Sequence, residues 1–441
     1  MPPVAQLVNW LTRPTQFLNE SRERYGDAFT VRFPGFERPM VIVSHPDHVA
    51  ELFKAPENTL PPGRRLALEP ILGDRSVLLL EGAEHLARRK LMLPAFHGER
   101  MRAYEEQITE IVEREIDSWP LAPGSEFPVH KRMQAVTLEV ILGAVFGVSD
   151  ERRLARLRPL LAGVLEQSSG LSTQVRFLLA SRVSWIGDPL AKVRETLVEV
   201  DELLIKEAAE RRTDPHLEER TDILSMLVTA RFEDGEAMSD RELRDQLMTL
   251  LIAGHETTAT ALAWAFDLLL HNPGPLQRLQ EEIRSGDGDE YLRATIAEVL
   301  RVRPVIPLAG RRLARPMLVN GYKLEPGDDV TPAIWLTNTR PETYPEPLEF
   351  RPERFLDEAP ETYAWIPFGG GIRRCLGAAF AEFEMRIVLR AVLGRCELEA
   401  ARDKPEGVTR RNVTFSPKHG TPVRLRSRGP RPTRALEPTP G

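Results

Sequence analysis

Residues 239–271 constrain the fold more than any other stretch, because they read as one long helix. Ser239 with Glu242 has the pattern of a capping box, and the dipeptide Asn272-Pro273 stops the helix at its other end. At roughly 1.5 Å of rise per residue this helix would be about 50 Å long, which exceeds the diameter of a small domain. We therefore expect one central helix that crosses the whole molecule.

Helical periodicity also dominates the rest of the chain, and the few strand-like stretches do not alternate regularly with helices. The predicted fold class is therefore mainly α with small β-sheets. Helices are expected over residues 46–55, 82–95, 97–119, 131–147, 150–168, 191–213, 222–230, 239–271, 289–302 and 376–395, and strands over 28–33, 40–43, 316–324 and 412–425. We expect a single domain over residues 15–426. Residues 427–441 are rich in Pro and Arg and lack apolar periodicity, which predicts a disordered tail.

Composition and charge exclude several classes of function. The net charge of -6 gives no reason to expect nucleic acid as a partner. The two cysteines, Cys375 and Cys396, cannot form a disulfide framework, which makes the cytoplasm the expected location. No signal peptide is recognisable, and no apolar run reaches the ~18 residues of a membrane span. We therefore expect no membrane span or anchor.

The middle of the long helix, from Ala253 to Thr258, is a poor choice for helix stability. Gly254 costs about 1 kcal/mol relative to alanine, and threonine is also a weak helix former. A tolerated glycine beside a surface polar patch is one explanation, but the flanking stretches are strongly apolar. A small residue lets a flat ligand approach the backbone, and the Thr257 hydroxyl can compete for a backbone carbonyl and open a groove. Glu256 in such a groove can pass protons.

The segment FGGGIRRCLGA, from Phe368 to Ala378, is the strongest chemical signal in the chain. Its glycine-rich loop delivers Cys375 to the start of the helix expected over 376–395. Backbone N–H groups and the helix dipole stabilise a thiolate at such a position, so this cysteine should have a lowered pKa and bind metal well. The alternative is that a lone cysteine is only a small buried hydrophobic residue.

This segment resembles the haem-binding loop of the cytochrome P-450 family, Phe-x-x-Gly-x-Arg-x-Cys-x-Gly. Every defined position matches, namely Phe368, Gly371, Arg373, Cys375 and Gly377. The resemblance implies the cytochrome P-450 fold, in which the long central helix crosses a haem b group. It also implies that Cys375 is the axial ligand of the haem iron.

An ion-pair motif of the same family follows in the expected order. Glu298-x-x-Arg301, together with Arg354 in a Pro-Glu-Arg-Phe segment, resembles the buried network beneath the haem. Without the resemblance, Glu298 and Arg301 would be read as an exposed i,i+3 pair. Buried ion pairs are kept for geometry rather than for net stability, so we expect a structural role.

The resemblance also assigns groups that bind the haem propionates. His85 and Arg89 lie four residues apart on one helical face, and Arg311 matches the propionate-binding arginine that precedes a glycine turn. With Arg373 they would donate charged hydrogen bonds to carboxylates. Arg312 competes with Arg311 for this role.

The centre of the long helix resembles the oxygen-activation segment of the family. Ala253 and Gly254 would then lie against the haem, and Glu256 and Thr257 would be the catalytic acid–alcohol pair. His255 fills a variable position and is expected to point away from the iron.

The resemblance implies a monooxygenase that inserts one oxygen atom of O2 into a hydrophobic small molecule, by hydroxylation or epoxidation. No flavin or iron–sulfur motif is present, so electrons from NAD(P)H should arrive through an external ferredoxin and ferredoxin reductase. Arg88, Lys90, Arg373 and Arg374 either form a docking patch for this acidic carrier or are solvated surface charges. We expect a cytoplasmic monomer. The alternatives are a peroxide-using enzyme of the same fold, which typically lacks the acid–alcohol pair, and a non-catalytic haem-binding sensor.

Apolar residues in regions that line the substrate pocket of this family favour a fatty acid, terpenoid, steroid or polyketide. The segment 169–190 is expected to form a mobile lid over this pocket. The expected lining residues are Leu78, Leu80, Leu250, Val305, Ile306 and Leu308.

Overall fold

The computed structural model describes residues 1–431, except for residues 35–37, 57, 62–67, 97, 123, 148–150, 170–190 and 357–360. The expected lid, apart from its first residue, and the last ten residues of the expected tail therefore lie outside the described residues. The first two residues of that tail belong to a strand, β11 (Pro422–Arg428).

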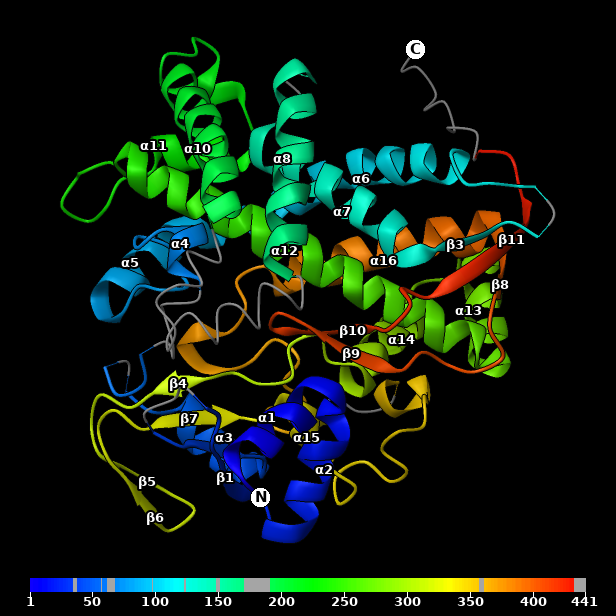
Figure 1. Ribbon diagram of the computed structural model, residues 1–441. Coiled ribbons are helices and arrows are strands. Elements are labelled where there is room, and N and C mark those ends of the chain that lie inside the picture. Colours follow the sequence, from blue (N-terminus) through cyan, green and yellow to red (C-terminus); the bar gives the residue numbers. More distant parts are fainter. Residues whose placement is uncertain are drawn as a thin grey trace, which may run out of the picture.

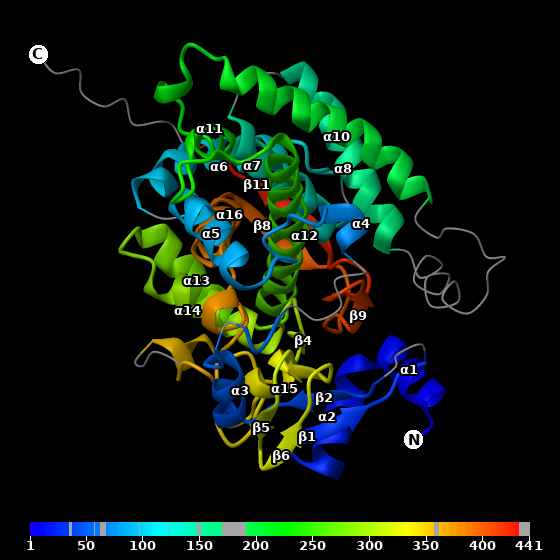
Figure 2. The same cartoon turned by 90° about the vertical axis from the view of Figure 1, so that its left-hand side faces the viewer.

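The long helix α12 (Asp240–Leu270) runs through the middle of the molecule in two views at right angles (Figure 1, Figure 2). The Ser239 hydroxyl accepts the N–H of Glu242, and the Glu242 carboxylate accepts the N–H of Ser239, so the expected capping box is present. Twelve consecutive residues, from Thr258 to Leu269, are buried. The predictions of a central helix and of a mainly α fold with small sheets are confirmed.

The central helix packs most extensively against α7 (Val129–Phe146), which is itself buried on nearly all sides. Where the two helices cross, a Cβ atom on Gly254 would lie 3.1 Å from Cδ1 of Ile141, which is tighter than ordinary van der Waals contact. Gly254 therefore permits the close approach of α7. The other helices around this pair are α6 (Glu99–Asp117), α8 (Glu151–Ser169), α10 (Ala191–Arg212), α11 (Ile223–Thr229), α13 (Pro273–Ser285), α14 (Glu290–Val302) and α16 (Ala378–Arg395).

A four-stranded sheet with the strand order β1-β2-β7-β4 lies at the opposite end of the molecule from α10 (Figure 1). Its strands are β1 (Ala28–Val31), β2 (Met40–Val43), β7 (Asp329–Pro332) and β4 (Arg311–Arg312). The strand β2 pairs antiparallel with β1 and parallel with β7. Near this sheet are the helices α1 (Pro3–Thr12), α2 (Pro14–Tyr25) and α15 (Ile334–Asn338). An apolar cluster separate from the main core contains Trp10, Phe17 and Trp335 of these helices together with Phe415.

Three smaller sheets complete the described part of the chain. In the hairpin of β5 (Met317–Val319) and β6 (Tyr322–Leu324), Asn320 and Gly321 have φ values of 50° and 74°. Two positive φ values at an Asn-Gly turn are typical of a tight hairpin. The hairpin of β9 (Val408–Arg411) and β10 (Thr414–Pro417) packs against α12, and β11 lies between β3 (Glu126–Pro128) and β8 (Cys396–Ala400).

Between β2 and α6 in sequence lie the short helices α3 (Pro46–Phe53), α4 (Glu69–Leu72) and α5 (Gly82–Met92). Among the described residues, no helix is both long enough and apolar enough to cross a membrane.

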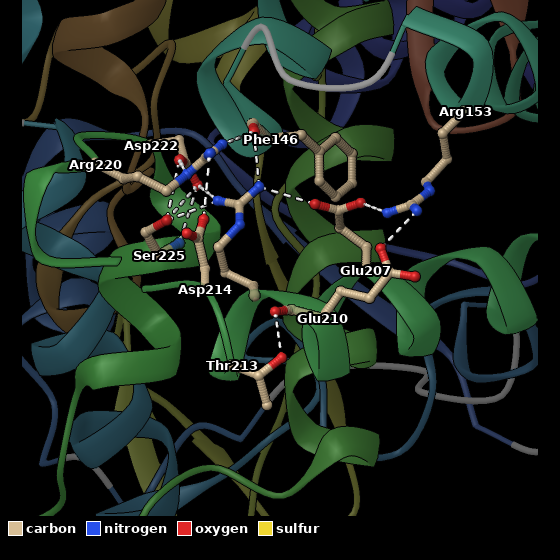
Figure 3. A network of polar contacts seen from close by, with 10 residues as sticks. Phe146, Arg153, Glu207, Glu210, Thr213, Asp214, Arg220, Asp222 and Ser225 are labelled. Atoms are coloured by element: carbon tan, nitrogen blue, oxygen red, sulfur yellow. Dashed lines mark hydrogen bonds and ion pairs between the residues drawn. The ribbon is translucent and has the colours of Figure 1, made fainter. Parts of the chain in front are cut away.

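A buried network of charges fixes the end of α7 against α10 and α11 (Figure 3). The guanidinium of Arg211, which is 3% exposed, pairs with Asp222 and with Glu207, the latter at 2.8 Å. It also donates to the carbonyl of Phe146 at 2.9 Å, and Arg220 donates to the same carbonyl at 3.1 Å. Phe146 is the last residue of α7, where carbonyls lack partners within the helix. The two arginines therefore act as a cap for α7.

A second buried charge-bearing group, Glu384 in α16, predicts a pH dependence of stability. Its side chain is 1% exposed, its Oε1 has no hydrogen-bond partner, and burial raises its pKa well above the ordinary value. The folded state therefore holds a proton that the unfolded state releases once the pH exceeds the ordinary carboxyl pKa. Stability falls as the pH rises from that value to the raised folded pKa, by about 1.4 kcal/mol for each unit of difference.

We expect Glu384→Gln to reduce this loss of stability. Thermal or urea unfolding at about pH 5 and about pH 8 measures the change, because the neutral amide cannot ionise. Glu105→Gln, at an exposed position of α6, is the control and should retain the full difference of the parent protein. An unchanged difference in the Glu384 variant would show that this carboxyl does not titrate in the folded state as we infer.

Candidate active site

The loop before α16 holds Cys375 in a fixed position. Gly371 has a φ of +64°, and a Cβ atom there would lie 2.2 Å from the carbonyl oxygen of Phe53 at the end of α3. Both its conformation and its contact therefore require glycine. The N–H of Cys375 donates to the carbonyl of Phe368 at 2.9 Å, which closes the loop. The helix that follows begins at Ala378, so the cysteine lies just before its N-terminus.

The thiol of Cys375 is accessible but surrounded by protein. The residue is solvent-exposed, yet burial among neighbouring groups raises the pKa of its thiol, which indicates a recess rather than an open surface. A hydrogen bond from the N–H of Gly377 and the charges of Arg374 and Arg89 act in the opposite direction and stabilise a thiolate. The expected lowering of the pKa was wrong for the protein without a metal, because desolvation outweighs these contributions. A bound metal cation reverses the balance and deprotonates a coordinating thiol.

Positive groups gather around His85 in α5. Burial and the charges of Arg373, Arg89 and Arg311 together lower its pKa to about 4, so these three arginines act on one histidine. The His85 Nδ1 is buried without a hydrogen-bond partner. In the part of the chain that the structure describes, no carboxylate pairs with Arg89 or Arg311. A buried nitrogen without a partner, beside the positive charges of Arg89 and Arg311, fits a bound dianion such as the two propionates of haem.

The structure distinguishes the two neighbouring arginines that competed for this role. Arg312 forms an ion pair with Asp329 at 3.0 Å, whereas Arg311 acts on His85 and has its pKa lowered to about 10 by burial. Arg373 donates to the carbonyl of the buried Leu80 at 2.6 Å. This hydrogen bond holds the Cys375 loop, which contains Arg373, against the segment that precedes α5.

The centre of α12 presents Ala253 and Thr257 on one partly exposed face. The Thr257 hydroxyl donates to the carbonyl of Ala253 at 2.7 Å, which is the competition for a backbone carbonyl that the sequence suggested. Gly254 differs from expectation, because its open side is filled by Ile141 of α7, as described above. His255 is buried, and its carbonyl accepts the hydroxyl of Thr137 at 3.1 Å.

Glu256 is directed towards α7. Its Oε2 accepts a hydrogen bond from Gln134 Nε2 at 2.7 Å, and its Oε1 lies 3.6 Å from Nε2 of His130. Burial raises the pKa of Glu256, and Gln134 is the strongest group acting in the opposite direction. Within the described residues, Glu256 and Thr257 share no hydrogen bond. Sequence reasoning missed Gln134 and His130, because nothing near them in the chain indicates this contact across two helices.

The ion-pair motif forms a buried network. Arg301 and Glu298 in α14 are both fully buried, and the guanidinium binds the carboxylate at 2.6 Å and 2.7 Å. Arg301 also donates to the carbonyls of Asn338 and Pro347, at 3.0 Å and 2.8 Å. Arg354, in the short helix Pro352–Phe355, places its Nε 3.4 Å from Glu298. The pair is therefore not the exposed surface pair that its spacing alone would indicate.

The apolar residues expected to line a substrate pocket differ in burial and in the apolar clusters that they join. Leu78 is exposed, whereas Leu250 and Val305 are buried in the main core. Ile306 and Leu308 pack against two other apolar clusters.

Two of the four residues expected in a basic docking patch are paired with carboxylates. Arg88 pairs with Glu242 at the start of α12, and Lys90 pairs with Glu233 at 2.8 Å. These pairs neutralise part of the positive surface that the sequence suggested.

Comparison with known proteins places the chain in a family. The family model described as cytochrome P450 matches residues 3–421. A protein of Mycobacterium tuberculosis designated cytochrome P450 137 is 41% identical over 409 residues, which cover 91% of this chain and 84% of that protein. Cytochrome P450 135B1 of Mycobacterium bovis is 40% identical over 430 residues, covering 96% and 89%. A solved structure of retinoic acid-bound cyanobacterial CYP120A1 superposes with a TM-score of 0.82 at 24% identity, covering 95% of this chain and 96% of that one, and so shares the fold. The chain belongs to the cytochrome P450 family.

Proposed function

We propose that this protein is a haem-thiolate monooxygenase that inserts one atom of O2 into a hydrophobic small molecule. The observation that carries the proposal is the position of Arg89, whose charge acts both on the Cys375 thiol and on His85. An accessible thiol and the arginines that act on the buried His85 are thereby joined in one site. This combination suits haem b, which needs an iron ligand and groups that bind its propionates.

Separate groups of residues would bind the iron and the propionates of the haem. When bound, the haem supplies the iron that activates O2, and a thiolate ligand favours cleavage of the O–O bond. Cys375 provides that thiolate, and Gly371 fixes the loop from which it extends. His85, Arg89, Arg311 and Arg373 donate hydrogen bonds to the propionates and so orient the group.

Proton handling is assigned to Glu256 and Thr257 on α12. The Thr257 hydroxyl is positioned by the Ala253 carbonyl on the partly exposed face of the helix, and Glu256 provides a titratable carboxyl one residue away. An acid and a hydroxyl next to the reacting oxygen can deliver protons that allow loss of water. Their presence favours O2 with external electrons over peroxide as the oxidant, and turnover over simple haem binding.

Electrons are proposed to come from NAD(P)H through a separate ferredoxin and its reductase, because the sequence has no flavin or iron–sulfur motif. We also propose that the protein acts in the cytoplasm as a monomer. The two cysteines are both free, which suits a reducing compartment.

The deciding experiment is a spectrum of the reduced protein with carbon monoxide, followed by turnover assays. We expect the red-shifted absorption band of thiolate-ligated haem. Product formation on a panel of fatty acids, terpenoids, steroids and polyketides should require ferredoxin, reductase and O2, and peroxide alone should not replace them. A normal band without any turnover would favour a sensor, and efficient turnover with peroxide alone would favour the peroxide-using alternative.

Thr257→Ala is expected to uncouple electron consumption from product formation. Haem and substrate binding should be retained, but product formed per NAD(P)H should fall roughly ten-fold, with hydrogen peroxide released instead. Measuring NAD(P)H, product and peroxide in the same reaction tests this. Thr257→Ser keeps the hydroxyl and should preserve coupling; equal coupling in the alanine variant would contradict the proton-delivery role of Thr257.

A further inference from the structure

The polar groups between α7 and α12 form a buried environment around Glu256. Gln134 donates to its Oε2 at 2.7 Å, and His130 lies 3.6 Å from its Oε1 and 3.2 Å from the Thr260 hydroxyl. On the side of β9, the charge of Arg411 acts on both Glu256 and His130. These groups face the carboxyl from three different elements of the fold.

The two histidines near the Glu256 carboxyl are both neutral. Burial lowers the pKa of His130 to about 3, so this histidine is neutral at physiological pH. His255, whose Nδ1 is 3.9 Å from Glu256, has its pKa lowered to about 4 by burial and is also neutral. The hydrogen bonds to the carboxyl therefore come from two uncharged groups. One is the Gln134 amide, which donates at 2.7 Å from a half-buried position on α7, and the other is the Thr260 hydroxyl.

From this geometry we propose that Gln134 is a positioning residue that holds the Glu256 carboxyl against α7, withdrawn from Thr257, with His130 and Thr260 completing the pocket. The inference rests on the proposed function, in which Glu256 handles protons. Since Thr257 donates to the Ala253 carbonyl and not to Glu256, proton transfer between them runs through water, and the position in which Gln134 holds the carboxyl determines whether that water can bridge the two groups. The Gln134 hydrogen bond therefore controls how readily Glu256 takes part in proton transfer.

The first test observes the carboxyl itself in the purified full-length protein. Infrared difference spectra between the parent and Glu256→Gln identify the band of this side chain, and a pH titration of the band gives its pKa. A hydrogen bond to a carboxylate favours the charged form, so we expect Gln134→Leu to shift the band and to move its titration to higher pH. Gln107→Leu, an amide of α6 that packs against α7 at Gly143, is the matched control and should change neither.

The second test asks whether Gln134 acts through Glu256. Product formed per NAD(P)H is measured as a function of pH for the parent, for Gln134→Leu, for Glu256→Gln and for the double variant. We expect Gln134→Leu to lower coupling about ten-fold in the parent background and to have no further effect when Glu256 is already replaced. Gln134→Met, which keeps the length of the side chain, provides the same comparison if leucine disturbs folding.

The outcomes separate this inference from the function on which it rests. An unchanged infrared band and titration in Gln134→Leu overturn the positioning role, even if Glu256→Gln impairs coupling as the proposed function requires. Equal losses of coupling from Gln134→Leu in both backgrounds overturn it as well, since the residue would then act only on packing. Unimpaired coupling in Glu256→Gln refutes the proton-handling role of Glu256 and the inference together.

Discussion

Cys375→Ala is expected to abolish the red-shifted carbon monoxide band of the reduced protein and all monooxygenase turnover. The variant removes the accessible sulfur that lies beside Arg89, Arg374 and the N–H of Gly377. Without a thiolate, any haem that remains bound has lost the ligand that favours cleavage of the O–O bond. Reduced carbon monoxide spectra, haem content and product formation should therefore all differ from the parent.

The second cysteine provides the matched control for this experiment. Cys396 is buried where α16 passes into β8, and burial raises the pKa of its thiol to about 11. A buried, protonated thiol is a poor metal ligand, so Cys396→Ala should keep the band and the activity. If the Cys396 variant lost the band and the Cys375 variant kept it, the assignment of the iron ligand would be wrong.

Arg301→Ala is expected to lower the free energy of unfolding by about 3–5 kcal/mol. Removing the guanidinium leaves the fully buried Glu298 carboxylate without its main partner, and the charge of Arg354 at 3.4 Å replaces it only in part. The carbonyls of Asn338 and Pro347 lose a donor at the same time. Denaturant unfolding measures the effect, and a loss of haem content should accompany it.

An exposed arginine of the same helix shows whether burial causes this effect. Arg293 pairs with Asp289 at the start of α14 with 66% of its side chain exposed. Surface ion pairs contribute about 0–1 kcal/mol, so Arg293→Ala should cost no more than that. Similar losses in both variants would mean that Arg301 contributes no more than a surface charge.

The features that were predictable from the sequence are those encoded within a short stretch. The capping box at Ser239 and the run of apolar residues after Thr258 define α12 locally, and the spacing around Cys375 defines its loop. By contrast, the helix α13 was missed, because Asn272-Pro273 was read only as a stop. Proline stops one helix but is also favoured in the first turn of the next.

Features that depend on distant segments could not be predicted. Gln134 and Glu256 are separated by 122 residues, and their contact follows from how α7 crosses α12. The same crossing explains why Gly254 meets Ile141. The stretch 412–425 was expected as one strand, but it contains β10, a turn and most of β11, which pair with different neighbours. The thiol pKa of Cys375 also depends on surrounding protein that the sequence pattern does not reveal.

The parallel pairing of β2 with β7 has a consequence for the synthesis of this protein. Met40 pairs with Asp329, so β2 must wait for 289 further residues (329 − 40) before its partner is made. At about 5–20 residues per second, this interval lasts about 15–60 s on the ribosome. During that time β2 can pair with β1, but its other edge stays open to unrelated strands. The order in which the chain leaves the ribosome thus leaves one edge of this small sheet unpaired until late in synthesis, when chaperones can protect it.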